Sequence, residues 1–284
     1  MLNKKLNRSV SFLLIFFLSV LYTSAGINPL TINKKDSSQE SVPVNGSLLT
    51  PEIPLHPSMG SFIADYADDY EELFEKLRTS KSGYFKTFDK VFTQQNIPVE
   101  LKYLAVVESK LKTDARSGVG AVGLWQFMPV TAKQFGLKIT ATYDERQHVW
   151  KSIVAAAKYL NDLYDIFEDW LLVIASYNSG PAPVLNAIKK SGSRNFWKLQ
   201  NFLPKETRLH VKRFIATHYY FEGTGSLVTL GKAESEKYLK EVESFNSKNN
   251  TNDEKNETTD PASLLNQWIA VINNDKDLKL ILKK

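Results

Sequence analysis

Hydrophobic positions between residues 61 and 226 recur with a helical period, and no segment alternates as strands do. Gly180 and Gly192 follow two of the periodic segments and are typical of helix C-termini. The pattern predicts a mainly α fold, with one compact domain of roughly 165 residues, an ordinary domain size. The expected helices cover 62–77, 98–111, 132–135, 150–167, 170–177, 183–190 and 206–221.

The first 25 residues have the three-part layout of a secretory signal. Lys4, Lys5 and Arg8 precede an apolar run over 10–21, and small residues lead to Ala25. The run is shorter than the roughly 20 apolar residues that cross a bilayer. We therefore expect a signal peptide (1–25) cleaved near Ala25, with an uncleaved N-terminal segment as the alternative. Both options predict an exported protein of the periplasm or cell envelope.

Three further segments lie outside the periodic region. Residues 26–60 are rich in Ser, Pro, Asn and Thr and predict a flexible linker. Residues 227–260 predict a polar linker whose later part, from 246, is too polar to bury a core. Residues 261–284 place Leu264, Leu265 and Trp268 at helical spacing, which predicts a short amphipathic segment. Its role is open, and docking on a cell-wall protein partner is one possibility. The domain itself is expected over 61–226.

Composition excludes several classes of chemistry. The chain has 284 residues, with 36 Lys and Arg against 31 Asp and Glu, and a net charge of +5. The signal region holds three of those bases and no acid, so the remainder carries 5 − 3 = +2, which gives no reason to expect nucleic acid. Without cysteine there is no disulfide, thiolate metal site or lipid-acceptor thiol, so a lipoprotein is excluded. The four histidines lack zinc-hydrolase spacing, and no cofactor or metal is expected.

Glu108 is the candidate catalytic residue. In the helix expected over 98–111, it follows Leu101 by seven positions and Leu104 by four, so helical geometry puts it on the apolar face. Burial disfavours the ionised form of a carboxyl group and raises its pKa, as a general acid near neutral pH requires. The alternative is that Glu108 rims the helix end and pairs with a lysine.

A small-residue loop follows that helix. Gly118, Gly120 and Gly123 match the dinucleotide-binding pattern, but no apolar strand precedes them, so we reject that function. Glycines here instead permit a close approach of the backbone to a ligand or a neighbouring helix. Gln126 then lies among apolar and aromatic residues, either as a bridge within the core or as a ligand contact.

The segment over 170–180 is nearly all apolar until Tyr177 and Asn178, which close it. A tyrosine ring beside an amide suits the apolar face and the polar substituents of a sugar. The alternative is that Tyr177 fills the core and Asn178 caps the helix.

In chain order, Glu108-Ser109, the stretch GLWQFMP over 123–129, and Tyr177-Asn178 resemble the lytic transglycosylases of bacterial cell walls, which have a goose-lysozyme-like fold and an SLT domain. The resemblance covers about 96–215 and is closest to the membrane-bound lytic murein transglycosylase D group. It implies a lysozyme-like helical domain that acts on peptidoglycan glycan strands. The LysM repeats that usually follow in that group are not found here.

The resemblance also implies a mechanism and a set of site residues. A lytic transglycosylase cleaves the β-1,4 bond between N-acetylmuramic acid and N-acetylglucosamine without water and leaves 1,6-anhydromuramoyl ends. Glu108 would act as acid and then as base. Ser117 and Gln126 would hold the acid or the sugar, Met128 and Tyr177 would line the cleft, and Gln126, Tyr177 and Asn178 would orient the sugars.

The chain departs from the family pattern at two places. Ser176 stands where the family usually has Ala, and His210-Val211-Lys212 stand where it has Tyr followed by Val-Pro. The second departure affects the last aromatic contact of the cleft.

Two other functions compete with the transglycosylase. A lysozyme-type hydrolase needs a second acid that holds water, with Asp114, Asp144 and Glu206 as candidates. A non-catalytic peptidoglycan-binding or scaffold protein would need only the cleft and its aromatic residues.

Overall fold

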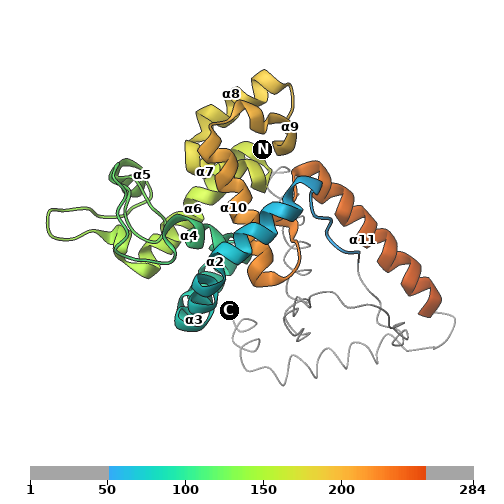
Figure 1. Ribbon diagram of the computed structural model, residues 1–284, viewed down its shortest axis with the longest axis horizontal. Helices are drawn as coiled ribbons and strands as arrows, with labels where there is room; N and C mark the ends of the chain where they lie inside the picture. Colours follow the sequence, from blue (N-terminus) through green and yellow to red (C-terminus); the bar gives the residue numbers. More distant parts are fainter. Residues whose placement is uncertain (1–50, 254–284) are drawn as a thin grey trace, which may run out of the picture. The chain divides into compact units, whose positions relative to one another are not determined.

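The computed structural model describes residues 51–253, which form helices joined by loops (Figure 1). In this range the extended backbone is limited to isolated bridges, so the prediction of a mainly α fold is confirmed. The signal at 1–25 and the segment at 261–284 lie outside the described residues. The chain divides into two units, 1–237 and 238–284, and the site lies wholly within the first.

Most of the predicted helices are present, several with longer bounds. Within residues 51–253 the sequence analysis missed three helices: α3 (Ser82–Gln94), α9 (Phe196–Leu199) and α11 (Lys232–Asp253). None of the helices within 51–253 is both long enough and apolar enough to cross a membrane. The elements in chain order are η2 (Pro57–Met59), α2 (Gly60–Ser80), α3 (Ser82–Gln94), η3 (Val99–Lys102), α4 (Tyr103–Ser109), α5 (Pro129–Gln134), η4 (Glu145–Gln147), α6 (Val149–Phe167), α7 (Trp170–Ser179), α8 (Pro181–Ser191), α9 (Phe196–Leu199), η5 (Gln200–Phe202), α10 (Lys205–Glu222), η6 (Leu227–Thr229) and α11 (Lys232–Asp253).

Helix α7 forms the centre of the core. Its residues from Trp170 to Ser176 are all buried, because the helix is apolar on every side and is packed by α6, α8 and α10. Asp169 caps its first turn by accepting a hydrogen bond of 3.2 Å from the Leu172 N–H. Gly180 and Gly192, with φ of 81° and 66°, end α7 and α8 as predicted.

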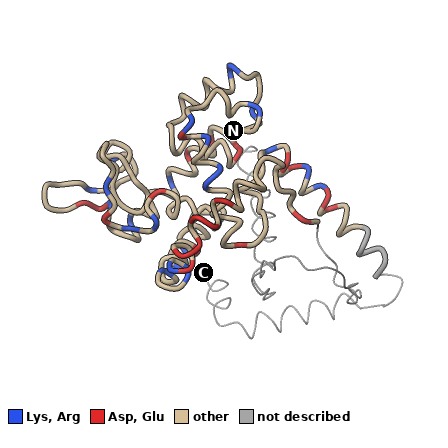
Figure 2. The backbone as a smooth tube through the Cα atoms, in the orientation of Figure 1, with Lys and Arg blue, Asp and Glu red and all other residues tan. Residues whose placement is uncertain are grey.

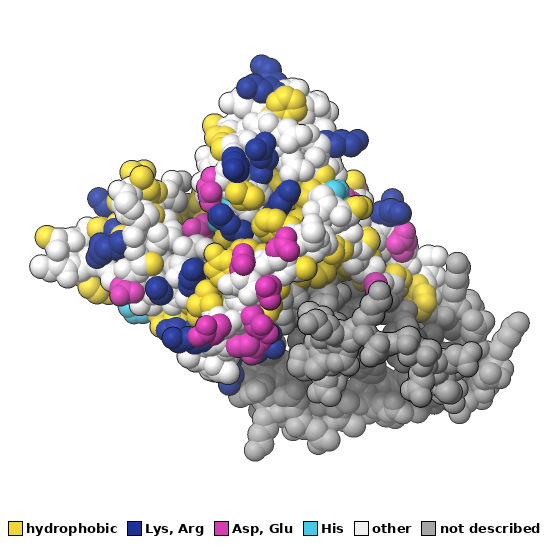
Figure 3. Space-filling view, viewed as in Figure 1, with side chains coloured by type: hydrophobic (Ala, Val, Ile, Leu, Met, Phe, Trp, Pro, Cys, Tyr) yellow, Lys and Arg dark blue, Asp and Glu magenta, His cyan; other side chains and the backbone are white. Residues whose placement is uncertain are grey.

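Helix α10 connects the core to the two elements nearest the site. It contacts α2, α4 and α7, and Figure 1 shows α2 and α10 side by side. Helix α2 turns Phe74 and Leu77 into the core, and its acidic residues lie on the exposed side (Figure 2). Hydrophobic side chains also reach the surface along α2 (Figure 3). Helix α4 therefore packs on α10, which also packs against α2.

The helix expected over 98–111 is shorter than predicted. It begins as η3 and continues as α4, and it ends because Lys110 and Leu111 both adopt left-handed backbone angles, with φ of 54° and 55°. Such angles are costly for residues other than glycine. Leu111 is fully buried, and this burial accompanies the abrupt end. Glu108 therefore lies in the last turn of α4.

Both linker predictions need correction where the structure describes them. Before α2, within the predicted linker 26–60, Met59 is buried and His56 stacks on Trp197 with ring centroids 3.7 Å apart. Within the predicted linker 227–260, residues up to Asp253 form η6 and α11. Lys, Glu, Ala and Leu are good helix formers even without an apolar period, and the Glu234 carboxylate accepts a hydrogen bond from the Gly231 N–H at its start.

Candidate active site

Glu108 lies in the last turn of α4, one turn after the fully buried Leu104. Only 15% of its side chain is exposed. Burial, and secondarily the negative charge of Glu206, raises the pKa of Glu108 to about 8. The predicted direction of this pKa shift is confirmed, and Glu108 is protonated at neutral pH.

His210 is the side chain that faces Glu108. Its Nε2 lies 3.4 Å from Oε1 of Glu108, and 4% of its side chain is exposed. Burial, with a smaller effect of Arg213, lowers the pKa of His210 to about 4. Between about pH 4 and 8 both groups are therefore neutral, and the contact is not an ion pair. Among residues 51–253 no lysine forms an ion pair with Glu108, so the alternative of a lysine partner is not supported.

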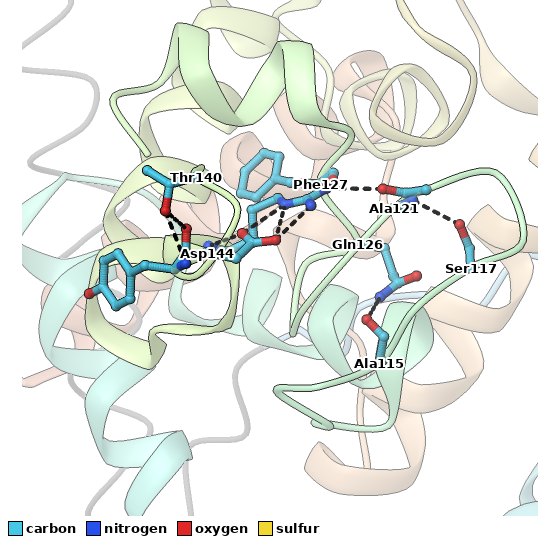
Figure 4. Close-up of polar contacts among 10 residues, drawn as sticks. Ala115, Ser117, Ala121, Gln126, Phe127, Thr140 and Asp144 are labelled. Carbon is cyan, nitrogen blue, oxygen red and sulfur yellow. Dashed lines mark hydrogen bonds and ion pairs between the residues drawn. The ribbon is translucent and has the colours of Figure 1, made fainter. Parts of the chain in front are cut away.

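The loop between α4 and α5 is held by its own polar groups (Figure 4). The side-chain amide nitrogen of Gln126 donates to the carbonyls of Ala115 and Gly123, at 3.2 and 2.9 Å, with the Gln126 backbone at a φ of 46°. The Ser117 hydroxyl accepts a 2.9 Å hydrogen bond from the Ala121 N–H. Gln126 and Ser117 thus shape the loop and make no hydrogen bond or ion pair with Glu108 among the described residues.

Gly123 and Arg146 lock this loop to the segment before α6. Gly123 has a φ of 88°, and a Cβ at this position would lie 2.1 Å from the Arg146 carbonyl oxygen. The Arg146 guanidinium donates to the carbonyls of Gly120 and Phe127, at 3.0 and 2.9 Å, and to the Asp144 carboxylate at 2.7 Å (Figure 4). The glycine thus serves a close approach of the loop to the neighbouring η4 turn, one of the two roles, ligand or neighbouring helix, that the sequence left open.

Two hydrogen bonds tie the loop to the helices. The Ser109 hydroxyl, at the end of α4, donates to the Leu124 carbonyl at 2.8 Å. The Tyr177 hydroxyl, near the end of α7, donates to the Trp125 carbonyl at 2.7 Å. Burial, followed by the nearby charge of Glu108, holds the pKa of Tyr177 well above its ordinary value. Tyr177 is therefore a neighbour of the acid.

Asn178 and Met128 occupy the edges of this arrangement. Asn178 accepts a hydrogen bond of 2.8 Å from the Thr207 hydroxyl, which joins the end of α7 to the start of α10. Met128 precedes the first residue of α5 and is 42% exposed, so it is free to contact a ligand. The structure thus brings Glu108, Tyr177 and His210 together, with Ser117, Gln126 and Met128 in the adjoining loop.

The three candidates for a second acid differ in their surroundings. Asp144 is occupied by Arg146, which holds its pKa below the ordinary value. Glu206 acts on the pKa of Glu108 but is 65% exposed and bonded to Arg213 at 2.7 Å. The structure assigns no role to Asp114. No cluster within the described residues could hold a metal ion.

His210 is the site residue that sequence reasoning did not assign. Its one signal was the departure from the family pattern at this position. A histidine on a helix gives no sign of its partner when that partner lies about a hundred residues earlier, and only the packing of α10 on α4 reveals the contact.

The site is thus a short helical segment with a buried glutamate, tied to a glycine-containing loop by the side-chain hydroxyl of Ser109. Residues 88–200 match the family model for the transglycosylase SLT domain, which confirms the resemblance seen in the motifs over that part of the chain.

The chain is similar to several known proteins. It is 41% identical over 128 residues to the membrane-bound lytic murein transglycosylase D of Escherichia coli K12, a match that covers 43% of this chain and 28% of that protein. It is 30% identical over 138 residues to the peptidoglycan transglycosylase gp16 of Escherichia phage T7, covering 46% of this chain and 10% of that protein. The chain thus spans well under half of either relative.

Among solved structures, the 70-kDa soluble lytic transglycosylase of Escherichia coli superposes with a TM-score of 0.47 at 25% identity. The alignment covers 61% of this chain and 32% of that one.

Proposed function

We propose that this protein is a peptidoglycan lytic transglycosylase that cleaves the bond between N-acetylmuramic acid and N-acetylglucosamine and leaves 1,6-anhydromuramoyl ends. The observation that carries the proposal is the environment of Glu108: a buried carboxyl group, protonated at neutral pH, within a matched SLT domain. The similarity to two transglycosylases supports it.

The reaction needs one carboxyl group that acts twice. Glu108 first gives its proton to the bridging oxygen as the bond from that oxygen to C1 of the muramic sugar breaks, and the substrate's acetamido group stabilises the cationic C1. The Glu108 carboxylate then takes the proton of the C6 hydroxyl while that oxygen bonds to C1. The carboxyl group is restored and no water is consumed. A pKa near 8 suits both steps, because the group is protonated at rest and becomes a competent base.

The other predicted residues would act at two levels. Met128, with its exposed side chain, would contact the sugar directly, and the Gln126 side-chain oxygen would accept a hydrogen bond from it. Ser117, Tyr177 and Asn178 already use polar groups within the protein, so they would serve by holding the loop and the ends of α7 and α10 in place. Such positioning contributes to rate through orientation of the substrate.

The test is mass spectrometry of the products released from purified peptidoglycan. We expect anhydro-muropeptides from the wild-type protein and none from Glu108→Gln, which keeps the shape of the side chain. Glu100→Gln, on the preceding η3 turn, is the matched control and should retain activity.

Three results would contradict parts of the proposal. Reducing ends heavier by one water would identify a lysozyme-type hydrolase. Activity in Glu108→Gln would remove the assignment of the acid. Co-sedimentation with sacculi without any released product would identify a binding protein.

We also propose that residues 1–25 direct export to the periplasm or cell envelope, where the substrate lies. The printed name of the Escherichia coli relative, a membrane-bound murein transglycosylase, agrees with an envelope location for that protein. Sequencing the N-terminus of the protein recovered from cells tests this. A start just after Ala25 supports cleavage, and a start at Met1 in a membrane fraction supports an uncleaved anchor.

A further inference from the structure

The contact between His210 and Glu108 is the feature of the site that the proposed mechanism leaves unused. The two residues lie on α10 and α4, which pack against each other, and Nε2 of His210 is 3.4 Å from Oε1 of Glu108. This separation is slightly longer than a hydrogen bond. Nε2 is buried and has no hydrogen-bond partner among the described residues. A buried nitrogen without a partner is costly, and Glu108 is positioned to supply one.

The surroundings keep the imidazole uncharged. Burial and the nearby Arg213 both disfavour the imidazolium form, which holds the pKa of His210 near 4. Among the described residues, the titratable groups that interact electrostatically with the pair are Glu206 and Arg213 on α10 and Tyr177 on α7. Glu206 and Arg213 are bonded to each other, so their charges largely offset. A neutral imidazole has one N–H donor and one acceptor nitrogen.

We propose that His210 is a positioning residue that, as the Nε2–H tautomer, donates a hydrogen bond to Oε1 of Glu108 throughout the reaction. The inference rests on the proposed function. Since Oε1 accepts from the imidazole, the acidic proton sits on Oε2 and is directed to the bridging oxygen of the substrate. When that proton leaves, the Nε2–H stabilises the carboxylate. His210 keeps its own proton at every step, so the proton balance of the reaction is unchanged.

The proposed hydrogen bond changes the pKa of Glu108 in a direction that can be measured. A donor to the carboxylate favours the ionised form of Glu108 and partly offsets its burial. Without the donor, Glu108 becomes a weaker acid, and the alkaline limb of the pH profile of kcat moves to higher pH. A merely structural histidine would lower activity equally at every pH and leave the limb in place.

The experiment compares wild type, His210→Leu and His210→Gln in the full chain. For His210→Leu we expect kcat to fall at least about tenfold, the size of a lost hydrogen bond to a charged group, with KM little changed. We expect the midpoint of the alkaline limb of the kcat profile to move to higher pH by about one unit. His210→Gln retains an N–H donor and should restore most of the rate and the position of the limb. An unmoved or lowered limb in His210→Leu would overturn the proposal.

Nuclear magnetic resonance separates this inference from the proposed function, because it needs no substrate. The ¹⁵N shifts of His210 should show the neutral Nε2–H tautomer near neutral pH, and the ¹³C signal of the Glu108 carboxyl group should titrate at higher pH in His210→Leu than in wild type. The Nδ1–H tautomer in the wild type would refute the hydrogen bond even in an active enzyme. A Glu108 titration that is the same in wild type and His210→Leu would refute it as well. If the expected shifts are seen but wild type releases no anhydro product, the proposed function fails while the contact stands.

Discussion

The hydroxyl of Tyr177 donates a 2.7 Å hydrogen bond to the backbone carbonyl of Trp125. This bond joins the end of the central helix α7 to the loop that precedes α5, beside the glutamate of α4. The hydroxyl end of Tyr177 is thus bonded to the backbone, while the centroid of its ring lies 6.5 Å from the centroid of the Trp125 ring. The tyrosine connects the core to the site.

Tyr177→Phe should therefore affect stability as well as activity. Removing the hydroxyl leaves the Trp125 carbonyl without this donor, so we expect the free energy of unfolding to fall by about 1 kcal/mol. Product release should also fall, because the loop is less firmly held. Denaturant unfolding and product analysis measure the two effects. Tyr143→Phe, at a 49% exposed position, is the control and should be close to neutral.

Gly123→Ala should disrupt the same loop more severely. The new Cβ would lie 2.1 Å from the Arg146 carbonyl oxygen, and the backbone at φ of 88° is strained for any side chain. We expect a loss of at least about 1–3 kcal/mol in the free energy of unfolding. Gly118→Ala, with open space around its Cβ, should cost little. Equal stability of the two variants in thermal unfolding would contradict the close approach.

Ser176→Ala should stabilise the protein. Ser176 is fully buried, and its hydroxyl has no hydrogen-bond partner among the described residues. Replacing it with the alanine usual in the family removes an unsatisfied polar group at nearly constant volume, so we expect a gain of about 1 kcal/mol. Peptidoglycan cleavage should be unchanged. A loss of stability in denaturant unfolding would show that the hydroxyl has a partner in solution.

Glu108→Gln should become more stable than the wild type as pH rises. Burial raises the pKa of Glu108 from its ordinary 4.5 to about 8, so in this window the folded state holds a proton that the unfolded chain has released. The wild type therefore loses stability as pH rises, by about 1.4 kcal/mol per pH unit for one group. Glutamine does not titrate. The difference in unfolding free energy should grow from about pH 4.5 to about pH 8, to at most about 5 kcal/mol.

A set of unfolding curves between these pH values measures this difference. The exposed Glu72 of α2 provides the control, because Glu72→Gln removes a surface carboxyl group and should leave the pH dependence close to that of the wild type. A difference between Glu108→Gln and wild type that stays flat with pH would mean that Glu108 is ionised in the folded protein at neutral pH.

Local patterns were enough to predict most of the fold. The apolar period located α2, α6, α7 and α10, and Gly180 and Gly192 marked the ends of α7 and α8. The predictions failed for two different reasons, an unusual backbone conformation in one case and a missing apolar pattern in the other. Helix α4 ends early at two left-handed residues, and the polar α11 has no apolar period to reveal it.

Periodicity also placed Glu108 on a buried face, and the order of the motifs indicated the SLT domain, because both depend on neighbours along the chain. The partners of the side chains were decided only by the tertiary structure. Whether Tyr177 meets a sugar or a backbone carbonyl, whether Gly123 serves a ligand or Arg146, and whether Glu108 faces a lysine or His210 depend on how distant segments pack. Spacing within one helix specifies a face, but what that face meets is set by the packing of the whole core.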